Sequence, residues 1–202
     1  MAMTILYPVG KQLYVNLTNR CPCNCTFCIR NNGDGAYGSD SLWLEHDPDF
    51  EEVKAAFADY DLSEWTELVF CGFGEPTEAL PLLLQTADYA HSLPGCPPVR
   101  LNTNGLADLI HGRSTAAEFA GRFDVISISL NAGTEAEYMA VTRPKWENAF
   151  AAMQQFAKEV KHYVPKVMFT VVDVISKAEI RAAQAVADAA GIPLRVREYT
   201  AD

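Results

Sequence analysis

The chain has 202 residues, of which 49% are hydrophobic and 21% charged, and its formal net charge is -10. These values fit one globular domain over residues 1–202 with a sizeable core. They argue against a general nucleic-acid-binding protein, because neutralising phosphates requires Lys and Arg. No apolar run is long enough to span a bilayer, and the first residues lack a signal-peptide pattern. We therefore expect no membrane association and a cytoplasmic location.

Short apolar runs rich in β-branched and aromatic residues alternate with helical patterns along the chain. We predict strands over 12–17, 67–71, 99–103, 124–130, 166–172 and 194–199. Helices are predicted to start at Asp47-Pro48, to cover 78–92 and 145–162, and to follow three capping-box patterns at Thr115–Glu118, Thr134–Glu137 and Ser176–Glu179, the last ending at Gly191.

Six strands that alternate with helices indicate an α/β fold with a parallel sheet covered by helices. A complete eight-unit barrel needs roughly 250 residues, more than this chain has. We therefore predict a parallel (β/α)6 partial TIM barrel. A doubly wound open sheet is the alternative that the strand pattern leaves open. The Gly-rich segment 31–41 is expected to be a mobile loop, either a plain connector or a flap over a site.

Four of the six cysteines lie within residues 21–28, which we call the cysteine loop. Cys21, Cys25 and Cys28 form a C-x3-C-x2-C triplet directly after the first predicted strand. Iron–sulfur clusters are normally held by four cysteines, so three would leave one iron open for chemistry. A zinc knuckle or unconnected core cysteines are the alternatives. Cys23 is predicted to be a bystander, and Cys71 and Cys96 to be core or surface cysteines.

Unusual residues also follow the next three predicted strands. Gly72-Phe-Gly-Glu-Pro76 follows the second strand, the third ends in Asn102-Thr-Asn-Gly105, and the fourth ends in Ser127-Ile-Ser-Leu-Asn131. In parallel α/β folds, sites form at the carboxyl ends of the strands. Each element alone has a simpler interpretation, because Glu75 could merely begin a helix, Asn-Gly could be a turn, and the serines could be strand residues.

Together these elements resemble the radical S-adenosylmethionine (radical SAM) enzymes. The resemblance implies that Cys21, Cys25 and Cys28 bind a [4Fe-4S] cluster. The Gly-Phe-Gly-Glu-Pro element is similar to the "GGE" element of that family, with Phe73 in place of one glycine. The residues implied to contact S-adenosylmethionine (SAM) are Phe27, Gly72, Gly74, Glu75, Thr103, Asn104, Ser129 and Asn131, with 170–172 near the adenine.

The resemblance also implies a reaction. A reduced cluster would cleave SAM to a 5′-deoxyadenosyl radical, which would abstract a hydrogen atom from an unidentified substrate. A flavodoxin- or ferredoxin-type reductant is implied, and an incomplete barrel favours a large substrate. Within the family the chain most resembles the TatD-linked radical SAM proteins, which suggests association with a TatD-type nuclease. The alternatives are an activating enzyme that makes a glycyl radical on a partner protein and a non-enzymatic metal or electron-transfer module.

Overall fold

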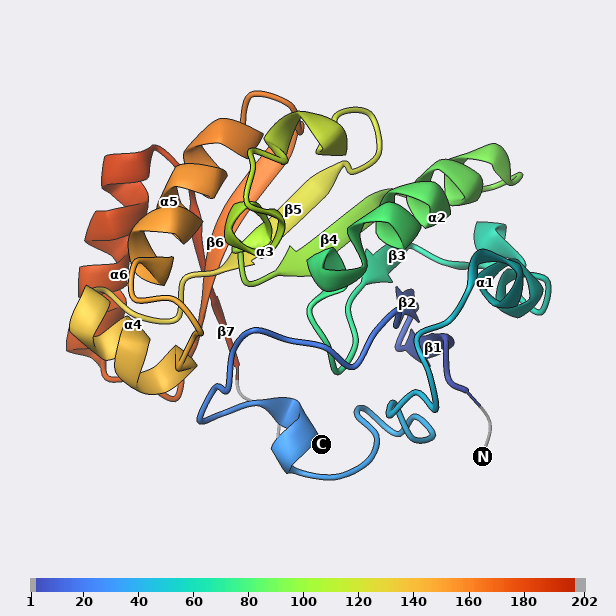
Figure 1. The fold of residues 1–202 in the computed structure, drawn as a ribbon, viewed down its shortest axis with the longest axis horizontal. Coiled ribbons are helices and arrows are strands. Elements are labelled where there is room, and N and C mark those ends of the chain that lie inside the picture. Colours follow the sequence, from blue (N-terminus) through green and yellow to red (C-terminus); the bar gives the residue numbers. More distant parts are fainter. Residues whose placement is uncertain (1–2, 199–202) are drawn as a thin grey trace.

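The computed structural model describes residues 3–198, which form one curved sheet with helices packed along it (Figure 1). The seven strands lie in the sheet in the same order as in the sequence, and the sheet is not closed into a barrel. All neighbouring strands are parallel except the first pair. The strands are β1 Leu6–Val9, β2 Gln12–Val15, β3 Glu67–Phe70, β4 Val99–Thr103, β5 Val125–Ser129, β6 Lys166–Val172 and β7 Leu194–Arg197.

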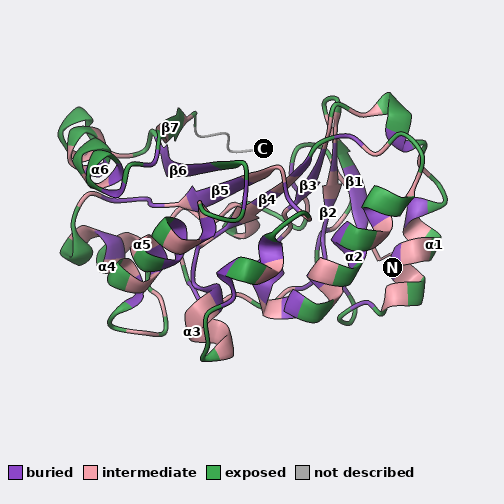
Figure 2. Ribbon diagram, turned by 90° about the horizontal axis from the view of Figure 1, so that it is seen from above, coloured by how far each residue is buried: buried purple, intermediate pink, exposed green. Residues whose placement is uncertain are grey.

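The sequential strand order decides between the two predicted architectures. A doubly wound sheet reverses its order at a switch point, whereas here every parallel connection steps to the next strand in the same direction. Right-handed crossovers then place the helices on one face of the sheet, as Figure 2 shows. The partial-barrel prediction is confirmed. The helices are α1 Phe50–Phe57, α2 Leu80–Ser92, α3 Ala107–His111, α4 Glu135–Thr142, α5 Ala149–Val160 and α6 Lys177–Ala190.

Strand β1 was not predicted from the sequence. It pairs with β2 in an antiparallel hairpin, with Leu6 opposite Val15, across a turn in which Gly10 has φ 59°. Pro8 within the run argues against a central strand, but β1 lies at the edge of the sheet, where a missing backbone donor is tolerated. The six parallel strands fall within the predicted ranges, and Tyr199 of the last range lies outside the described residues.

Two predicted helix starts are corrected by the structure. The first helix begins at Phe50 with Asp49 as its N-cap, because the Asp49 side chain forms a capping box with Glu52, so the start predicted at Asp47-Pro48 is two residues early. The Thr115–Glu118 pattern opens only a 3-10 turn, Ala116–Phe119, and forms no capping box. The Thr115 hydroxyl instead donates to Asp108, which also accepts from its backbone N–H.

The other two capping patterns do begin helices. The Thr134 side chain accepts from the backbone N–H of Glu137 and donates its hydroxyl to that carboxylate. Ser176 and Glu179 form a complete reciprocal box at the start of α6, which ends at Gly191 in the left-handed conformation. Both ends of α6 are therefore set by local sequence.

The Ser176 cap gives a first testable expectation. Ser176→Ala removes the acceptor for the Glu179 backbone N–H, so the free energy of unfolding should fall by about 1 kcal/mol. Urea denaturation followed by circular dichroism measures the change. Ser176→Asp restores a side-chain acceptor at the N-cap and should keep wild-type stability, whereas an equal loss in both variants would contradict the capping role.

The main core lies between the sheet and its helices. The residues on the helix side of the strands are almost completely buried, including Leu13, Phe70, Leu101, Ile128 and Phe169. Among residues 3–198 no helix is both long and apolar enough to cross a bilayer. The opposite face and the carboxyl ends of the strands carry the polar residues, which leaves that end of the sheet for a site.

Candidate active site

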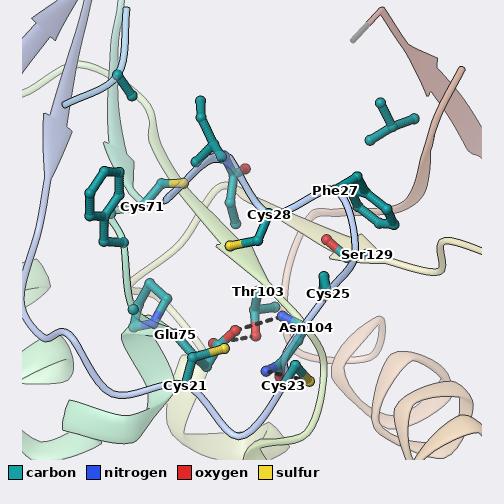
Figure 3. A pocket seen from close by; sticks show the side chains of 18 of the residues that line it. Cys21, Cys23, Cys25, Phe27, Cys28, Cys71, Glu75, Thr103, Asn104 and Ser129 are labelled. Carbon is teal, nitrogen blue, oxygen red and sulfur yellow. Dashed lines mark hydrogen bonds between the residues drawn. The ribbon is translucent and has the colours of Figure 1, made fainter. Parts of the chain in front are cut away.

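A cavity of about 260 Å³ opens at the carboxyl ends of the strands. All eleven residues predicted as cluster or cofactor ligands line it. They come from four separate segments, yet Figure 3 shows the labelled ones around one hollow. The predicted residues lining the cavity are Cys21, Cys25, Phe27, Cys28, Gly72, Gly74, Glu75, Thr103, Asn104, Ser129 and Asn131.

The cysteine loop is held in place by helix α4, which follows β5. After β2 it crosses beneath the strand ends toward α4 (Figure 1). There the backbone N–H of Asn24 donates to the carbonyl of Thr142 at 3.1 Å, and that of Thr26 to Val141 at 2.9 Å. Cys23 forms an isolated bridge with Pro144. Main-chain contacts to the last turn of α4 and to the connection after it thus fix the loop without using its thiols.

Cys23 differs from the other three cysteines of the loop. Its side chain is buried and accepts a weak hydrogen bond from Asn104 Nδ2 at 3.7 Å, whereas Cys21, Cys25 and Cys28 are partly exposed to the cavity. Hydrogen bonds from Cys23 lower the pKa of Cys21 and Cys25, and burial raises the pKa of Cys28. The pKa of Cys23 is raised, first by those same hydrogen bonds. Cys23 is therefore the cysteine of this loop with a buried side chain.

The thiols are not gathered around one point. Within residues 3–198 no three His, Cys, Asp or Glu side chains are close enough together to hold a single metal ion. A tetrahedral zinc ion needs its thiolates about 2.3 Å from the metal. A cluster distributes its thiolates over several irons, and this suits more widely spaced cysteines. All six cysteines are free thiols.

The second motif packs tightly against the segment that leads into the cysteine loop. A Cβ at Gly72 would overlap with the Asn16 side chain, and one at Gly74 would overlap with the carbonyl of Thr18. This close approach lets the Glu75 backbone N–H donate to the Arg20 carbonyl at 2.8 Å. Both glycines are therefore required because two backbone segments meet at the cavity.

Phe73 stands between these glycines and faces away from them. It is buried in a small second core with Tyr7, Ala36 and Leu42, and its ring meets Trp43 edge-on at 5.0 Å. Ala36 and Leu42 anchor the segment 31–41 and its continuation, which the sequence predicted only as a loop. Phe73 thus joins this loop to the sheet at the cavity rim, a role that local sequence did not reveal.

Glu75 is the most completely satisfied polar residue of the cavity. Its side chain is 4% exposed. Oε1 accepts from the Thr103 hydroxyl at 2.6 Å, the Thr77 hydroxyl at 2.8 Å and the Thr77 N–H at 3.2 Å, and Oε2 accepts from the Asn104 N–H at 2.7 Å (Figure 3). Burial raises the pKa of Glu75, while these four donors oppose that shift. Thr103 and Asn104 therefore position Glu75, whose Oε2 retains room for one more donor.

Asn131 provides an unused acceptor. It is 5% exposed, has φ 62°, and its Oδ1 has no hydrogen-bond partner among the described residues. Buried polar atoms are normally paired, so an orphan that lines a cavity indicates a bound donor. The left-handed backbone, which Asn tolerates, turns the chain directly after β5 while the Asn131 N–H donates to Thr170 at 3.2 Å.

Several residues that line the cavity were not predicted as site residues. Tyr7 and Tyr14 enter from the β1–β2 hairpin, which was missed with β1, and Cys71 lies at the end of β3. Arg197 and Glu198, at the end of the last strand, both line the cavity. Of the predicted 170–172 stretch, Val172 lines the cavity. The alternation of residues along β1 and β2 was the signal that could have found the tyrosines.

A comparison with family models matches residues 15–183 to the model described as Radical SAM superfamily. This chain belongs to the radical SAM superfamily. It is thus an enzyme of the class that uses a [4Fe-4S] cluster and SAM, and the non-enzymatic alternative is set aside. A comparison with curated proteins finds no match.

Solved structures of radical SAM enzymes share the fold of this chain. Streptococcus suis SuiB bound to precursor peptide SuiA is 15% identical with a TM-score of 0.64, covering 96% of this chain and 40% of SuiB. SuiB bound to S-adenosylmethionine is 16% identical with a TM-score of 0.61, again covering 96% of this chain and 40% of SuiB. Native anSMEcpe with bound AdoMet is 15% identical with a TM-score of 0.60, and the match covers 92% of this chain and 50% of anSMEcpe. The chain therefore spans half or less of each of these proteins.

The cavity of this radical SAM enzyme fits both cofactors of the superfamily. Three partly exposed thiols supply the donor set that iron–sulfur clusters use. Beside them lie the orphan Oδ1 of Asn131 and the acceptor Oε2 of Glu75, which suit the hydroxyl and ammonium donors of SAM. Gly72 and Gly74 line the same cavity, where they allow the segment before the cysteine loop to pack against this motif.

Proposed function

We propose that this radical SAM enzyme holds its cluster through Cys21, Cys25 and Cys28 and holds SAM in the same cavity, in order to abstract a hydrogen atom from its substrate. When bound, the cluster and SAM supply one-electron cleavage that yields a 5′-deoxyadenosyl radical. The observation that supports this most is the convergence of all eleven predicted residues, from four strand ends, on one cavity.

The protein residues would mainly bind and orient. Glu75 Oε2 would accept from the methionyl amine, since four donors already fix the carboxylate and one acceptor position remains. Asn131 Oδ1 would accept from a ribose hydroxyl, the Ser129 hydroxyl would donate to the carboxylate, and the Phe27 ring would lie against the adenine. Figure 3 supports this division, because Phe27 and Ser129 lie on the β5–β7 side and Glu75 lies beside Cys21.

Features of the fold and the motifs support proposals about the substrate, the subgroup and the reductant. Within the part of the chain that the structure describes, β1 and β7 form unpaired edges of the sheet, and this favours a large substrate that enters from the side. SuiB, which shares the fold, is bound to a precursor peptide in its structure. The cysteine loop and the Phe-Gly-Glu-Pro element support assignment to the TatD-linked group and association with a TatD-type nuclease. A flavodoxin- or ferredoxin-type reductant would supply the electron. The cytoplasm would be the location, since cysteines stay reduced there.

Anaerobic reconstitution tests the proposal directly. The full chain is loaded with iron and sulfide, reduced with dithionite and given SAM, and 5′-deoxyadenosine is measured by chromatography. We expect about four irons per chain, as a [4Fe-4S] cluster requires, and 5′-deoxyadenosine that depends on both reductant and SAM. A chain that carries the full cluster yet forms no 5′-deoxyadenosine would contradict the proposal, and a requirement for added partner protein would indicate the glycyl-radical alternative.

A further inference from the structure

Two hydroxyl groups on one face of α4 have no hydrogen-bond partner. Tyr138 and Thr142 stand one helical turn apart, at positions i and i+4, and therefore share a face. Tyr138 is 0% exposed and Thr142 is 1% exposed, and neither hydroxyl is paired within residues 3–198. Buried hydroxyls are nearly always paired in folded proteins. Two orphans on one helix face therefore call for a common acceptor.

The face that carries them is turned toward the cysteine loop. Thr142 lines the cavity together with Cys21, Cys23 and Cys25, and its carbonyl accepts from the Asn24 N–H. The Tyr138 ring packs against Phe150 at 5.2 Å. Burial raises the pKa of Tyr138, and the charges of Cys23 and Cys25 raise it further, which places those thiols among its electrostatic neighbours. Thr142 therefore lies beside the cysteine loop, and Tyr138 lies one helical turn before it on the same helix face.

The main-chain carbonyls that join the end of α4 to the cysteine loop are already engaged. The Thr142 and Val141 carbonyls accept from Asn24 and Thr26, and the Pro22 carbonyl accepts from Lys145. A buried water would need two to four polar partners of its own. The thiolate and sulfide atoms of a bound cluster would supply acceptors on this side of the loop.

We propose that Tyr138 and Thr142 donate hydrogen bonds to the sulfur atoms on the α4 side of the cluster and thereby raise its reduction potential. The inference rests on the proposed function, because it requires the cluster at Cys21, Cys25 and Cys28. Hydrogen bonds to cluster sulfurs are one of the means by which a protein sets this potential. A reduced cluster carries one more negative charge, so donors stabilise the reduced form more than the oxidised form.

Removing the hydroxyls should therefore make the cluster harder to reduce. For Tyr138→Phe combined with Thr142→Val, we expect the ratio of reduced to oxidised cluster at a fixed potential to fall about tenfold, which equals about 59 mV for one electron. Each single variant should fall about threefold. Electron paramagnetic resonance of the reconstituted full chain, poised at a series of potentials, measures the ratio, and iron analysis gives cluster content.

Two controls separate a cluster contact from a packing effect. Thr86 on α2 carries another buried orphan hydroxyl with 0% exposure, so Thr86→Val repeats the chemical change far from the cavity and should leave the ratio unchanged. Thr142→Ser keeps the hydroxyl and should also keep the wild-type ratio. In the metal-free protein, Tyr138→Phe and Thr142→Val should unfold at the wild-type temperature or above, because they remove unpaired polar groups.

The outcomes that would overturn the inference are distinct from those for the proposed function. If the double variant binds as much iron as the wild type and keeps the wild-type ratio, the hydroxyls do not contact the cluster. The proposed function would be unaffected by that result. The same conclusion follows if Thr142→Ser shifts the ratio as much as Thr142→Val. Wild-type protein that takes up no cluster would overturn the proposed function, and this inference with it.

Discussion

Cys25→Ala is expected to abolish both cluster binding and 5′-deoxyadenosine formation, whereas Cys23→Ala should retain both. The two positions are separated by one residue but differ in their surroundings. Cys25 is partly exposed and lines the cavity, so its sulfur can reach a bound iron. Cys23 is buried in the core, so we expect its thiol to contribute to packing, while its main chain bridges Pro144.

Reconstitution of both variants with iron and sulfide checks this prediction. With two of three ligands left, Cys25→Ala should hold less than about a tenth of the wild-type iron, since three cysteines are already one fewer than a cluster normally has. Cys23→Ala should lose about 1 kcal/mol of stability from the small core gap. Cys96→Ala, away from the cavity, is the matched control. Loss of the cluster in Cys23→Ala would show that the ligand set is assigned incorrectly.

Glu75→Gln is expected to be the most damaging isosteric change outside the cysteine loop. All four protein partners of this carboxylate are donors. An amide has one acceptor oxygen, so its NH₂ group must face either Asn104 N–H or the threonine hydroxyls, and a buried donor is left unpaired. The free energy of unfolding should fall by about 2–3 kcal/mol. SAM binding should weaken about tenfold or more, because Oε2 is the proposed acceptor for its amine.

Urea denaturation and equilibrium binding of SAM to the reconstituted enzyme measure these two effects. Glu78→Gln is the control, because Glu78 lies three residues further along in the same 3-10 turn and its carboxylate makes no hydrogen bond within the described residues. It should match wild type in both measurements. If Glu75→Gln is as stable as Glu78→Gln, the hydrogen bonds to Glu75 contribute little, and its role in positioning a ligand would have to be abandoned.

The strand-end motifs could be predicted because each depends on neighbouring residues. An apolar run of five to seven residues followed by Gly, Asn or Ser is readable locally, and a sequential parallel sheet then brings those ends to one edge. Elements that depend on distant contacts were missed or misread. Thr115 has a sequence suited to a capping box, yet Asp108 from the preceding helix takes its hydroxyl and N–H. Strand β1 exists only because β2 offers it an edge.

For this protein, the sequence by itself determined which cysteines are candidate cluster ligands and in which order the strand-end motifs occur. The spacing of Cys21, Cys25 and Cys28, the glycines on either side of Phe73, and the location of each motif after a strand are all local properties. Only the tertiary structure decided which thiol is buried, which carbonyls hold the cysteine loop, and which hydroxyls face it. The reason is physical, because burial and hydrogen-bond satisfaction are set by residues as far apart as Asn24 and Thr142. Their pairing depends on how α4 packs beneath the strand ends.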